Sequence, residues 1–183
     1  MPTLTRTPTV DELLATPQPE LVALFRTLPA PRMEELDGEY AGYSPDGGDP
    51  ELRQVIQERM FNEDSALGYW LGKAYRPHSE THGEGYNVWR KRGVELRNLR
   101  FATELGLSHI DQRPAVIMHY GAFRNDAAER GLIDEIRKLD DGLFLGAGSF
   151  AAPEGGRTEP GCFVIAHRRR DWCGVDDPAA EVR

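Results

Sequence analysis

Cysteine, positive charge and long apolar runs are all scarce in this sequence of 183 residues. The two cysteines, Cys162 and Cys173, form no C-x-x-C pair, so we expect reduced thiols rather than a zinc site or a disulfide scaffold. Acidic residues outnumber basic ones by 30 to 22, and the net charge of −8 argues against binding to nucleic acid or to a membrane surface. No stretch approaches the ~18 consecutive apolar residues that a membrane-spanning helix needs.

Several catalytic and targeting signatures are missing as well. Residues 1–6 lack the basic-then-apolar pattern of a secretory signal, so we expect a cytoplasmic protein. The sequence has no G-x-S-x-G elbow, no P-loop lysine motif and no H-E-x-x-H pair. Gly83-Glu84-Gly85 is no dinucleotide fingerprint, because it lacks the third glycine and the strand-to-helix context. We therefore expect no nucleotide chemistry, no classical hydrolysis and no cofactor.

Glycine and proline divide the chain into two regions. None of the 19 glycines lies before Gly38, whereas six of the 13 prolines lie in the first 31 residues. We interpret residues 1–32 as a helical lead attached outside the main fold, in the role of a lid. Helices are predicted over residues 10–14, capped by Thr9 with Glu12 in a capping box, over residues 20–28 behind Pro19, and over residues 50–61.

From Gly68 onward the sequence pattern changes to a period of two, which is typical of strands. The candidate strands are joined by short turns, of which Asp140-Asp141-Gly142 gives the strongest hairpin signal. Short strands without helices between them predict an antiparallel sheet that closes into a barrel. We expect a mainly β fold: a single antiparallel barrel of about eight strands, with short N-terminal helices and one helix after the first strand. The barrel is expected over residues 33–175, with strands at 34–43, 67–75, 85–90, 94–104, 115–123, 132–139, 143–150 and 162–167, followed by a tail at 176–183.

The segment Gly68-Tyr69-Trp70-Leu71-Gly72-Lys73 carries a G-x-W-x-G pattern. Strand alternation puts both glycines and the Trp70 ring on one face. A bulky ring flanked by bare backbone suits a bend or an end of a barrel. Trp70 is then either a plug of the core or an aromatic wall of a ligand pocket, and the sequence leaves both readings open.

Short motifs in the chain resemble a known bacterial group. Residues 68–73, preceded by residues 35–40 (Glu-Leu-Asp-Gly-Glu-Tyr), resemble the small GXWXG domain and its companion domain of unknown function. Residues 134–137 (Asp-Glu-Ile-Arg) and 142–146 (Gly-Leu-Phe-Leu-Gly) are similar to the closing hairpin of that group. The resemblance spans residues 33–150 in scattered motifs and implies a lipocalin-like (calycin) barrel, but no particular reaction.

The apolar strand predicted at residues 115–123 contains His119 and Tyr120, which alternation places on opposite faces. Antiparallel pairing with the next strand is expected to bring Asp134 and Glu135 opposite Tyr120 and its neighbour. A His or Tyr beside a carboxylate is a candidate acid/base pair, because burial and a neighbouring charge tune its pKa. The alternative is a structural hydrogen bond inside the barrel. The candidate catalytic residues are His119, Tyr120 and Glu135.

Neighbouring strands supply further polar side chains. Asn98 and Arg100 share one face of an otherwise apolar strand, and an arginine inside a barrel needs a carboxylate or an anionic ligand. We therefore predict a buried ion pair between Arg100 and Asp134 or Glu135. The candidate ligand-binding residues are Trp70, Tyr86, Asn87, Asn98, Arg100 and Asp134.

Histidine spacing raises the question of a metal site. His78 and His82 lie four residues apart, which would put both on one face of a helix, but Pro77 and Gly83 indicate a loop. A third ligand would also have to come from a nearby glutamate. We predict a solvated loop and no metal.

These features favour a barrel that binds one small, largely apolar molecule, because an eight-stranded barrel is just wide enough for a small ligand. Enclosure of a flexible substrate would favour a cofactor-free cyclisation or isomerisation, steered by one or two polar groups. One alternative is a non-catalytic carrier or sensor, and the resemblance to G-x-W-x-G barrels implies that it could hold haem through a histidine. The other is a structural barrel whose helical lead binds another protein. The expected partner is a small hydrophobic molecule, not nucleic acid or membrane, and homodimer formation stays open.

Overall fold

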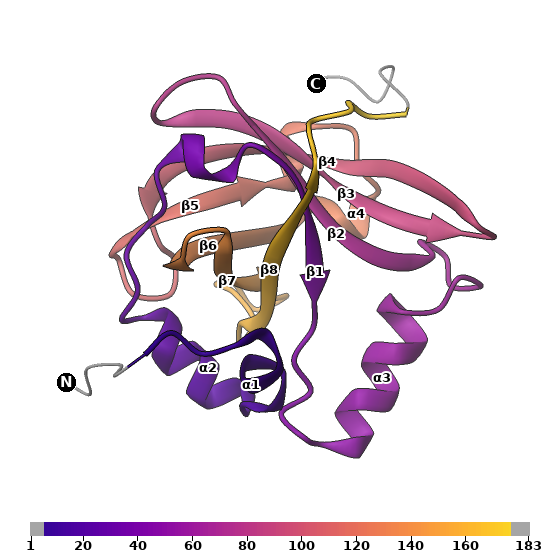
Figure 1. Ribbon diagram of the computed structural model, residues 1–183, viewed down its shortest axis with the longest axis horizontal. Helices are drawn as coiled ribbons and strands as arrows, with labels where there is room; N and C mark the ends of the chain where they lie inside the picture. The colour runs from indigo at the N-terminus through magenta and orange to yellow at the C-terminus, as the bar shows by residue number, and fades with distance from the viewer. Residues whose placement is uncertain (1–5, 177–183) are drawn as a thin grey trace.

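The structure, a computed structural model, describes residues 6–176 except for the side chains of residues 127 and 128. Eight antiparallel strands form a closed barrel, in which each strand pairs with the next and the last pairs with the first (Figure 1). This architecture confirms the predicted mainly β fold with a single eight-stranded antiparallel barrel. The strands are β1 (Gly38–Tyr43), β2 (Tyr69–Pro77), β3 (His82–Lys91), β4 (Val94–Leu107), β5 (Pro114–His119), β6 (Leu132–Asp140), β7 (Leu143–Phe150) and β8 (Gly161–Arg170).

The predicted helices are present, with shifted ends. Thr9 caps α1 (Val10–Ala15) in a complete capping box with Glu12, and Pro19 lies in the first turn of α2 (Gln18–Phe25). The helix after the first strand, α3 (Pro50–Met60), is capped by the Asp49 side chain. Three further helical turns are η1 (Met33–Leu36), η2 (Tyr120–Ala122) and α4 (Ala127–Arg130).

Two strand predictions were too long. Residues 34–36 belong to the turn η1, and the first strand begins only at Gly38. The strand predicted at 115–123 ends at His119, because the chain turns into η2, where the Asn125 amide donates to the carbonyls of Tyr120 and Arg100. Tyr120 therefore sits on a turn beyond the end of β5. The predicted tail lies outside the described residues beyond Asp176.

Apolar side chains pack in a barrel interior and in layers outside it. The interior cluster contains aromatic residues from most strands, among them Trp70, Phe101 and Phe163. Outside the barrel, α1 and α2 cover β7 and β8, with Leu21 and Phe25 packed against a second apolar cluster. The helical lead thus covers a side wall of the barrel, as Figure 1 shows, while α3 stands apart from that wall. Within residues 6–176, no helix combines the length and the apolar character needed to cross a membrane.

Candidate functional site

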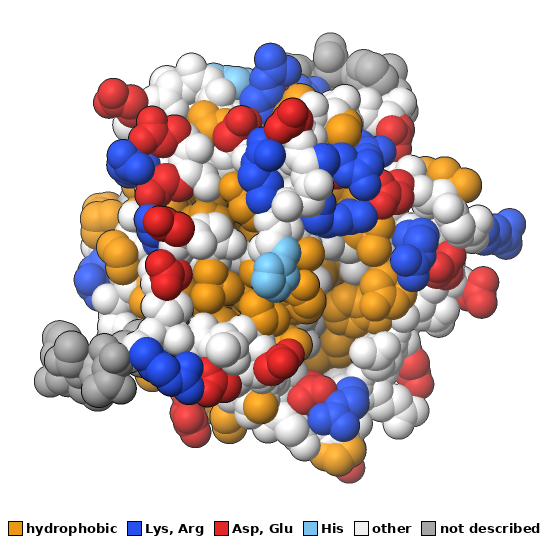
Figure 2. Space-filling view, viewed as in Figure 1, with side chains coloured by type: hydrophobic (Ala, Val, Ile, Leu, Met, Phe, Trp, Pro, Cys, Tyr) orange, Lys and Arg blue, Asp and Glu red, His pale blue; other side chains and the backbone are white. Residues whose placement is uncertain are grey.

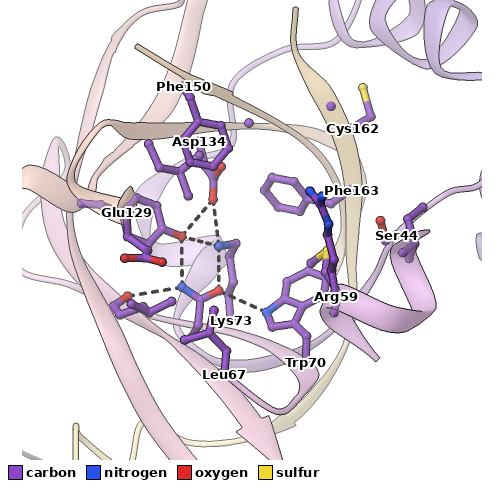
Figure 3. Close-up of a pocket in the computed structure, with 18 of the residues that line it drawn as sticks. Ser44, Arg59, Leu67, Trp70, Lys73, Glu129, Asp134, Phe150, Cys162 and Phe163 are labelled. Carbon is purple, nitrogen blue, oxygen red and sulfur yellow. Dashed lines mark hydrogen bonds and ion pairs between the residues drawn. The ribbon is translucent and has the colours of Figure 1, made fainter. Parts of the chain in front are cut away.

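A cavity of about 610 Å³ lies inside the barrel. Its rim includes α3, which contributes Leu52, Ile56 and Met60, together with Phe150 at the end of β7. Deeper in the barrel, rings from β2, β3 and β8 form the wall, and Figure 3 shows Trp70 and Phe163 next to Lys73, where the two rings pack edge to face. Figure 2 shows hydrophobic side chains gathered in a hollow on the face of the molecule that carries α3. Exposed polar side chains, among them Arg59 and Glu159, also line the cavity, but the fully buried polar side chains of the lining gather at one place.

That place is a buried cluster of four polar side chains, Lys73, Asn87, Tyr120 and Asp134, called the polar cluster below. The Lys73 ammonium lies 2.9 Å from Asp134 Oδ2, and it donates to Asn87 Oδ1 at 2.9 Å and to the Tyr120 hydroxyl at 2.5 Å. The Tyr120 hydroxyl donates to Asp134 Oδ2 at 2.9 Å and accepts from Asn87 Nδ2 at 3.0 Å. The side chains of Lys73 and Asp134 are only 4% and 6% exposed. One positive and one negative charge are thus held together away from bulk water.

Trp70 and the backbone complete the hydrogen bonds of the cluster. Trp70 Nε1 donates to Asn87 Oδ1 at 3.1 Å, and Asn87 Nδ2 also donates to the Leu99 carbonyl at 3.3 Å. The Asn87 amide therefore uses both its donors and its acceptor. This fixes the amide orientation and makes Asn87 the link between the aromatic wall and the charged pair.

A β-bulge explains why Lys73 points inward. Trp70 pairs with Trp89, but the next pair is Gly72 with Val88, so β2 has one residue more than β3 at this point. The extra residue reverses the alternation of faces, and Trp70 and Lys73, three positions apart, both face the interior. Gly72 is required there, because its φ is +141° and a Cβ atom would lie 1.9 Å from the Tyr40 carbonyl oxygen.

Aromatic rings surround the ammonium group. Lys73 Nζ lies 5.2 Å from the centroid of the Phe163 ring and 5.3 Å from those of Phe101 and Tyr120. These distances suit cation–π attraction, which is stronger where water is excluded. Burial lowers the pKa of the Lys73 ammonium, an effect that the charge of Asp134 opposes.

The same environment keeps the phenol of Tyr120 neutral. Burial, and after it the charge of Asp134, raises the pKa of Tyr120 well above its ordinary value of 10. A neutral phenol retains its proton, and that proton makes the hydrogen bond to Asp134 Oδ2. Tyr120 therefore bridges the two charged residues as both donor and acceptor.

Four of the residues predicted from the sequence line this cavity: Trp70, Asn87, Tyr120 and Asp134. The expected pairing of Tyr120 with Asp134 across two strands differs from the observed register, in which Asp134 lies opposite Met118. The hydroxyl reaches the carboxylate nonetheless, because Tyr120 sits on the turn that follows β5 and its long side chain points inward.

His119 and Glu135 lie on the outer surface of the barrel, contrary to the prediction that they line the site. The His119 ring, 35% exposed, lies 3.0 Å from Glu104. Glu135 is buried outside the barrel, where Oε1 accepts from the backbone N–H of His109. Both side chains alternate with inward-facing neighbours, so strand geometry excludes them from the interior.

Three predicted ligand-binding residues, Tyr86, Asn98 and Arg100, are not among the residues that line the cavity. Arg100 pairs with Glu84, not with Asp134 or Glu135 as predicted, and Asn98 is exposed. The Tyr86 hydroxyl donates to the buried carboxylate of Glu39 at 2.8 Å. Tyr86 and Asn87 are neighbours on β3 and must point to opposite faces, so only Asn87 reaches the interior.

Lys73 was missed in the sequence because regular alternation from Trp70 puts it on the opposite face. The signal that could have revealed it is Gly72, since a glycine inside a strand often marks a bulge. Tyr75, which lies in the interior cluster but is not among the residues that line the cavity, was not predicted either. Its buried hydroxyl has no hydrogen-bond partner among the described residues.

A metal or a histidine-bound haem finds no ligand set in the described part of the chain. No three His, Cys, Asp or Glu side chains there gather closely enough to hold a metal ion. Among the described residues that line the cavity, none is a histidine. The fully buried polar side chains of the cavity supply an amine, a phenol, an amide and a carboxylate, and the half-buried Glu129 and the exposed Arg59 also line it.

Comparison with known proteins supports the fold alone. No protein-family model and no curated protein matches the chain. The chain is similar to the crystal structure of a protein from Thermomonospora curvata, with a TM-score of 0.55 and 18% identity over 84% of this chain and 88% of the other. The resemblance to the GXWXG domain stays a prediction.

Proposed function

We propose that the barrel binds one small, largely apolar molecule, whose polar end meets the polar cluster. The observation that carries this proposal is a largely apolar cavity whose fully buried polar side chains form a single cluster. Its volume of about 610 Å³ falls within the range of roughly 300–1,000 Å³ that is typical of small-molecule pockets. A few fixed polar groups in such a pocket orient a ligand and give specificity.

The charged pair itself favours a functional role. Two charges removed from water stabilise a fold little, and apolar residues of similar size often do as well or better. A buried Lys–Asp pair beside a cavity is therefore better explained by what it binds or does than by stability. Strongly perturbed ionisable groups are common at such sites.

An apolar fluorescent dye, N-phenyl-1-naphthylamine, tests the binding function. We expect saturable binding of one dye per chain and a loss of at least tenfold in affinity in Leu132→Trp, which fills the cavity. Leu107→Trp is the matched control, because Leu107 is 60% exposed and is not among the cavity-lining residues. Absence of binding, or equal binding by both variants, would contradict the proposal.

A second candidate, a cofactor-free isomerisation or cyclisation of the bound molecule, is favoured by the hydrogen bond of Tyr120 to Asp134 Oδ2. In that arrangement the carboxylate can take a proton while Tyr120 and Lys73 stabilise the charge that develops. The test is to extract the molecule that copurifies with the protein and to return it to fresh wild-type and Tyr120→Phe protein. A new product formed only by wild-type protein supports turnover, and recovery of unchanged molecule favours a carrier.

A further inference from the structure

The hydrogen bonds within the polar cluster use its donors but leave an acceptor free for a ligand. Lys73 has three donors, and its three partners are Asn87, Tyr120 and Asp134. The Tyr120 hydroxyl and the Asn87 amide donate within the cluster or to the backbone. A ligand that only accepts hydrogen bonds would have to displace one of these contacts.

Asp134 is different, because only one of its two oxygens is used. Lys73 and Tyr120 both contact Oδ2. No described donor makes a hydrogen bond to Oδ1, and Oδ1 is not among the fully enclosed polar atoms that lack a partner. Since Asp134 lines the cavity, this oxygen is a carboxylate acceptor open to the ligand.

Gly148 leaves the space that this oxygen occupies. It lies opposite Asp134 in the β6–β7 ladder and also lines the cavity. A Cβ atom on Gly148 would lie 2.4 Å from Asp134 Oδ1. Its φ lies outside the left-handed region, so the backbone does not call for a glycine there. The missing side chain keeps Oδ1 uncovered.

The wall also holds one unused donor. Trp89 lines the cavity, and its buried indole N–H has no acceptor among the described residues. The groups left over are thus two carboxylate acceptors, Asp134 Oδ1 beside the polar cluster and Glu129 Oε2, and a neutral donor, Trp89 Nε1. A hydroxyl group is the one common neutral group that offers a donor and an acceptor in a single atom.

We propose that the cavity selects a neutral apolar alcohol or phenol, whose hydroxyl donates to Asp134 Oδ1. This inference rests on the proposed binding function and names the class of ligand. A carboxylate ligand is disfavoured at this point because it brings a second negative charge next to Asp134 and no donor. An ether or ester of the same shape is disfavoured because it leaves the carboxylate oxygen desolvated and unpaired.

Three probes with one naphthalene skeleton separate these groups: 2-naphthol, 2-methoxynaphthalene and 2-naphthoate. Binding is measured by fluorescence titration at pH 7, where 2-naphthol is neutral. We expect 2-naphthol to bind at least about tenfold more tightly than 2-methoxynaphthalene, as a hydrogen bond to a charged group requires. The weakest binding is expected for 2-naphthoate.

Gly148→Ala tests the role of the uncovered oxygen without changing any charge. Its Cβ would lie 2.4 Å from Asp134 Oδ1, so the carboxylate has to shift away from its place in the cavity. The preference for 2-naphthol over 2-methoxynaphthalene should then fall to less than about threefold. Gly161→Ala is the matched control, because Gly161 also lines the cavity but its Cβ would meet nothing within 4 Å. That variant should keep the wild-type preference.

The outcomes distinguish this inference from the function on which it rests. Equal binding of 2-naphthol and 2-methoxynaphthalene overturns the inference and leaves ligand binding intact. Tightest binding of 2-naphthoate also overturns it and would place the polar end of the ligand at Arg59 on the rim. Absence of binding by all three probes, together with absence of dye binding, contradicts the proposed function itself.

Discussion

Lys73 is the residue on which the polar cluster depends, since it contacts every other member of the cluster. Without it, the carboxylate of Asp134 would lie in the barrel with a phenol as its remaining described partner. Breaking a buried ion pair by removing one partner is costly, because the other charge is left uncompensated. Replacing both partners with uncharged residues costs less stability, because no buried charge is left without a partner.

We predict that Lys73→Met lowers the free energy of unfolding by about 3–5 kcal/mol, the usual cost of an uncompensated buried charge. The double variant Lys73→Met, Asp134→Asn should recover most of that loss. Urea denaturation at pH 7 measures both. A double variant no more stable than the single one would show that the loss comes from packing of the lysine stem and not from charge.

Lys73 also shows where residue patterns stop being informative. The sequence pointed to Trp70, Asn87, Tyr120 and Asp134 as site residues, and all four line the cavity. It did not point to Lys73, because a single extra residue in β2 changes which side chains face inward. The sequence carries the glycine that permits the bulge but not the strand pairing that creates it.

Among the elements, α3 is the one most loosely attached. None of its residues is fully buried, although Leu52, Ile56 and Met60 line the cavity. A helix with few buried apolar contacts opens locally at low free-energy cost. The position of α3 on the rim makes it the candidate gate to the cavity.

We predict that backbone amides of α3 exchange hydrogen rapidly in the free protein and are protected at least tenfold when the cavity is filled. The reason is that a ligand supplies the apolar partner that this face of the helix lacks. Hydrogen exchange with mass spectrometry measures this, with β6 as the internal control. Protection that is the same with and without bound dye would contradict a gating role for α3.

A side chain on β6, that of Arg137, connects the helical lead to the barrel. Arg137 on its outer face is fully buried and pairs with Asp111, and it donates to the carbonyls of Phe25, Arg113 and Pro114. Its guanidinium also stacks on the Phe25 ring, with 4.6 Å between its central carbon and the ring centroid. One side chain thus joins the end of α2 to β6 and to the loop before β5.

We predict that Arg137→Met costs about 3–5 kcal/mol of unfolding free energy, because it leaves a carboxylate and several carbonyls without their donor. Arg137→Lys should recover only part of this, since an ammonium has three donors in place of five. Arg168→Lys, at an exposed position, is the control and should change stability by less than about 0.5 kcal/mol. If Arg137→Met lost no more unfolding free energy than Arg168→Lys, contacts other than those of Arg137 would hold the helical lead against the barrel.

In the whole molecule, the interior of the barrel and the layer outside it bury separate apolar clusters. Cys162 lies in the outer cluster beneath the lead, whereas Cys173 is exposed. Burial raises the pKa of the Cys162 thiol to about 12, so its reactive thiolate is scarce near neutral pH. The two thiols therefore report on whether the outer layer stays packed.

We predict that Ellman's reagent at pH 8 modifies one thiol per native chain, that of Cys173, and modifies the second only when the protein unfolds. Cys173→Ser protein should be nearly inert until urea is added. Rapid reaction of native Cys173→Ser protein would mean that α1 and α2 separate from β7 and β8 without global unfolding.

At the scale of the fold, local signals sufficed for much of the architecture. The strand at residues 143–150 was predicted with its observed ends because an Asp-Gly turn precedes it and its alternation is regular. The start of α1 was also predicted from a local signal, the capping box of Thr9 and Glu12. By contrast, the end of β5 depends on a hydrogen bond from Asn125 to the Tyr120 and Arg100 carbonyls, which no periodicity reveals.

The sequence by itself determined that the chain forms short antiparallel strands joined by turns, with helices before them and after the first strand. These features arise from interactions between near neighbours: alternation, turn residues and caps. Only the tertiary structure decided which polar side chains meet inside the barrel. That choice depends on bulges and on register between distant strands, where one added residue turns every following side chain to the other face.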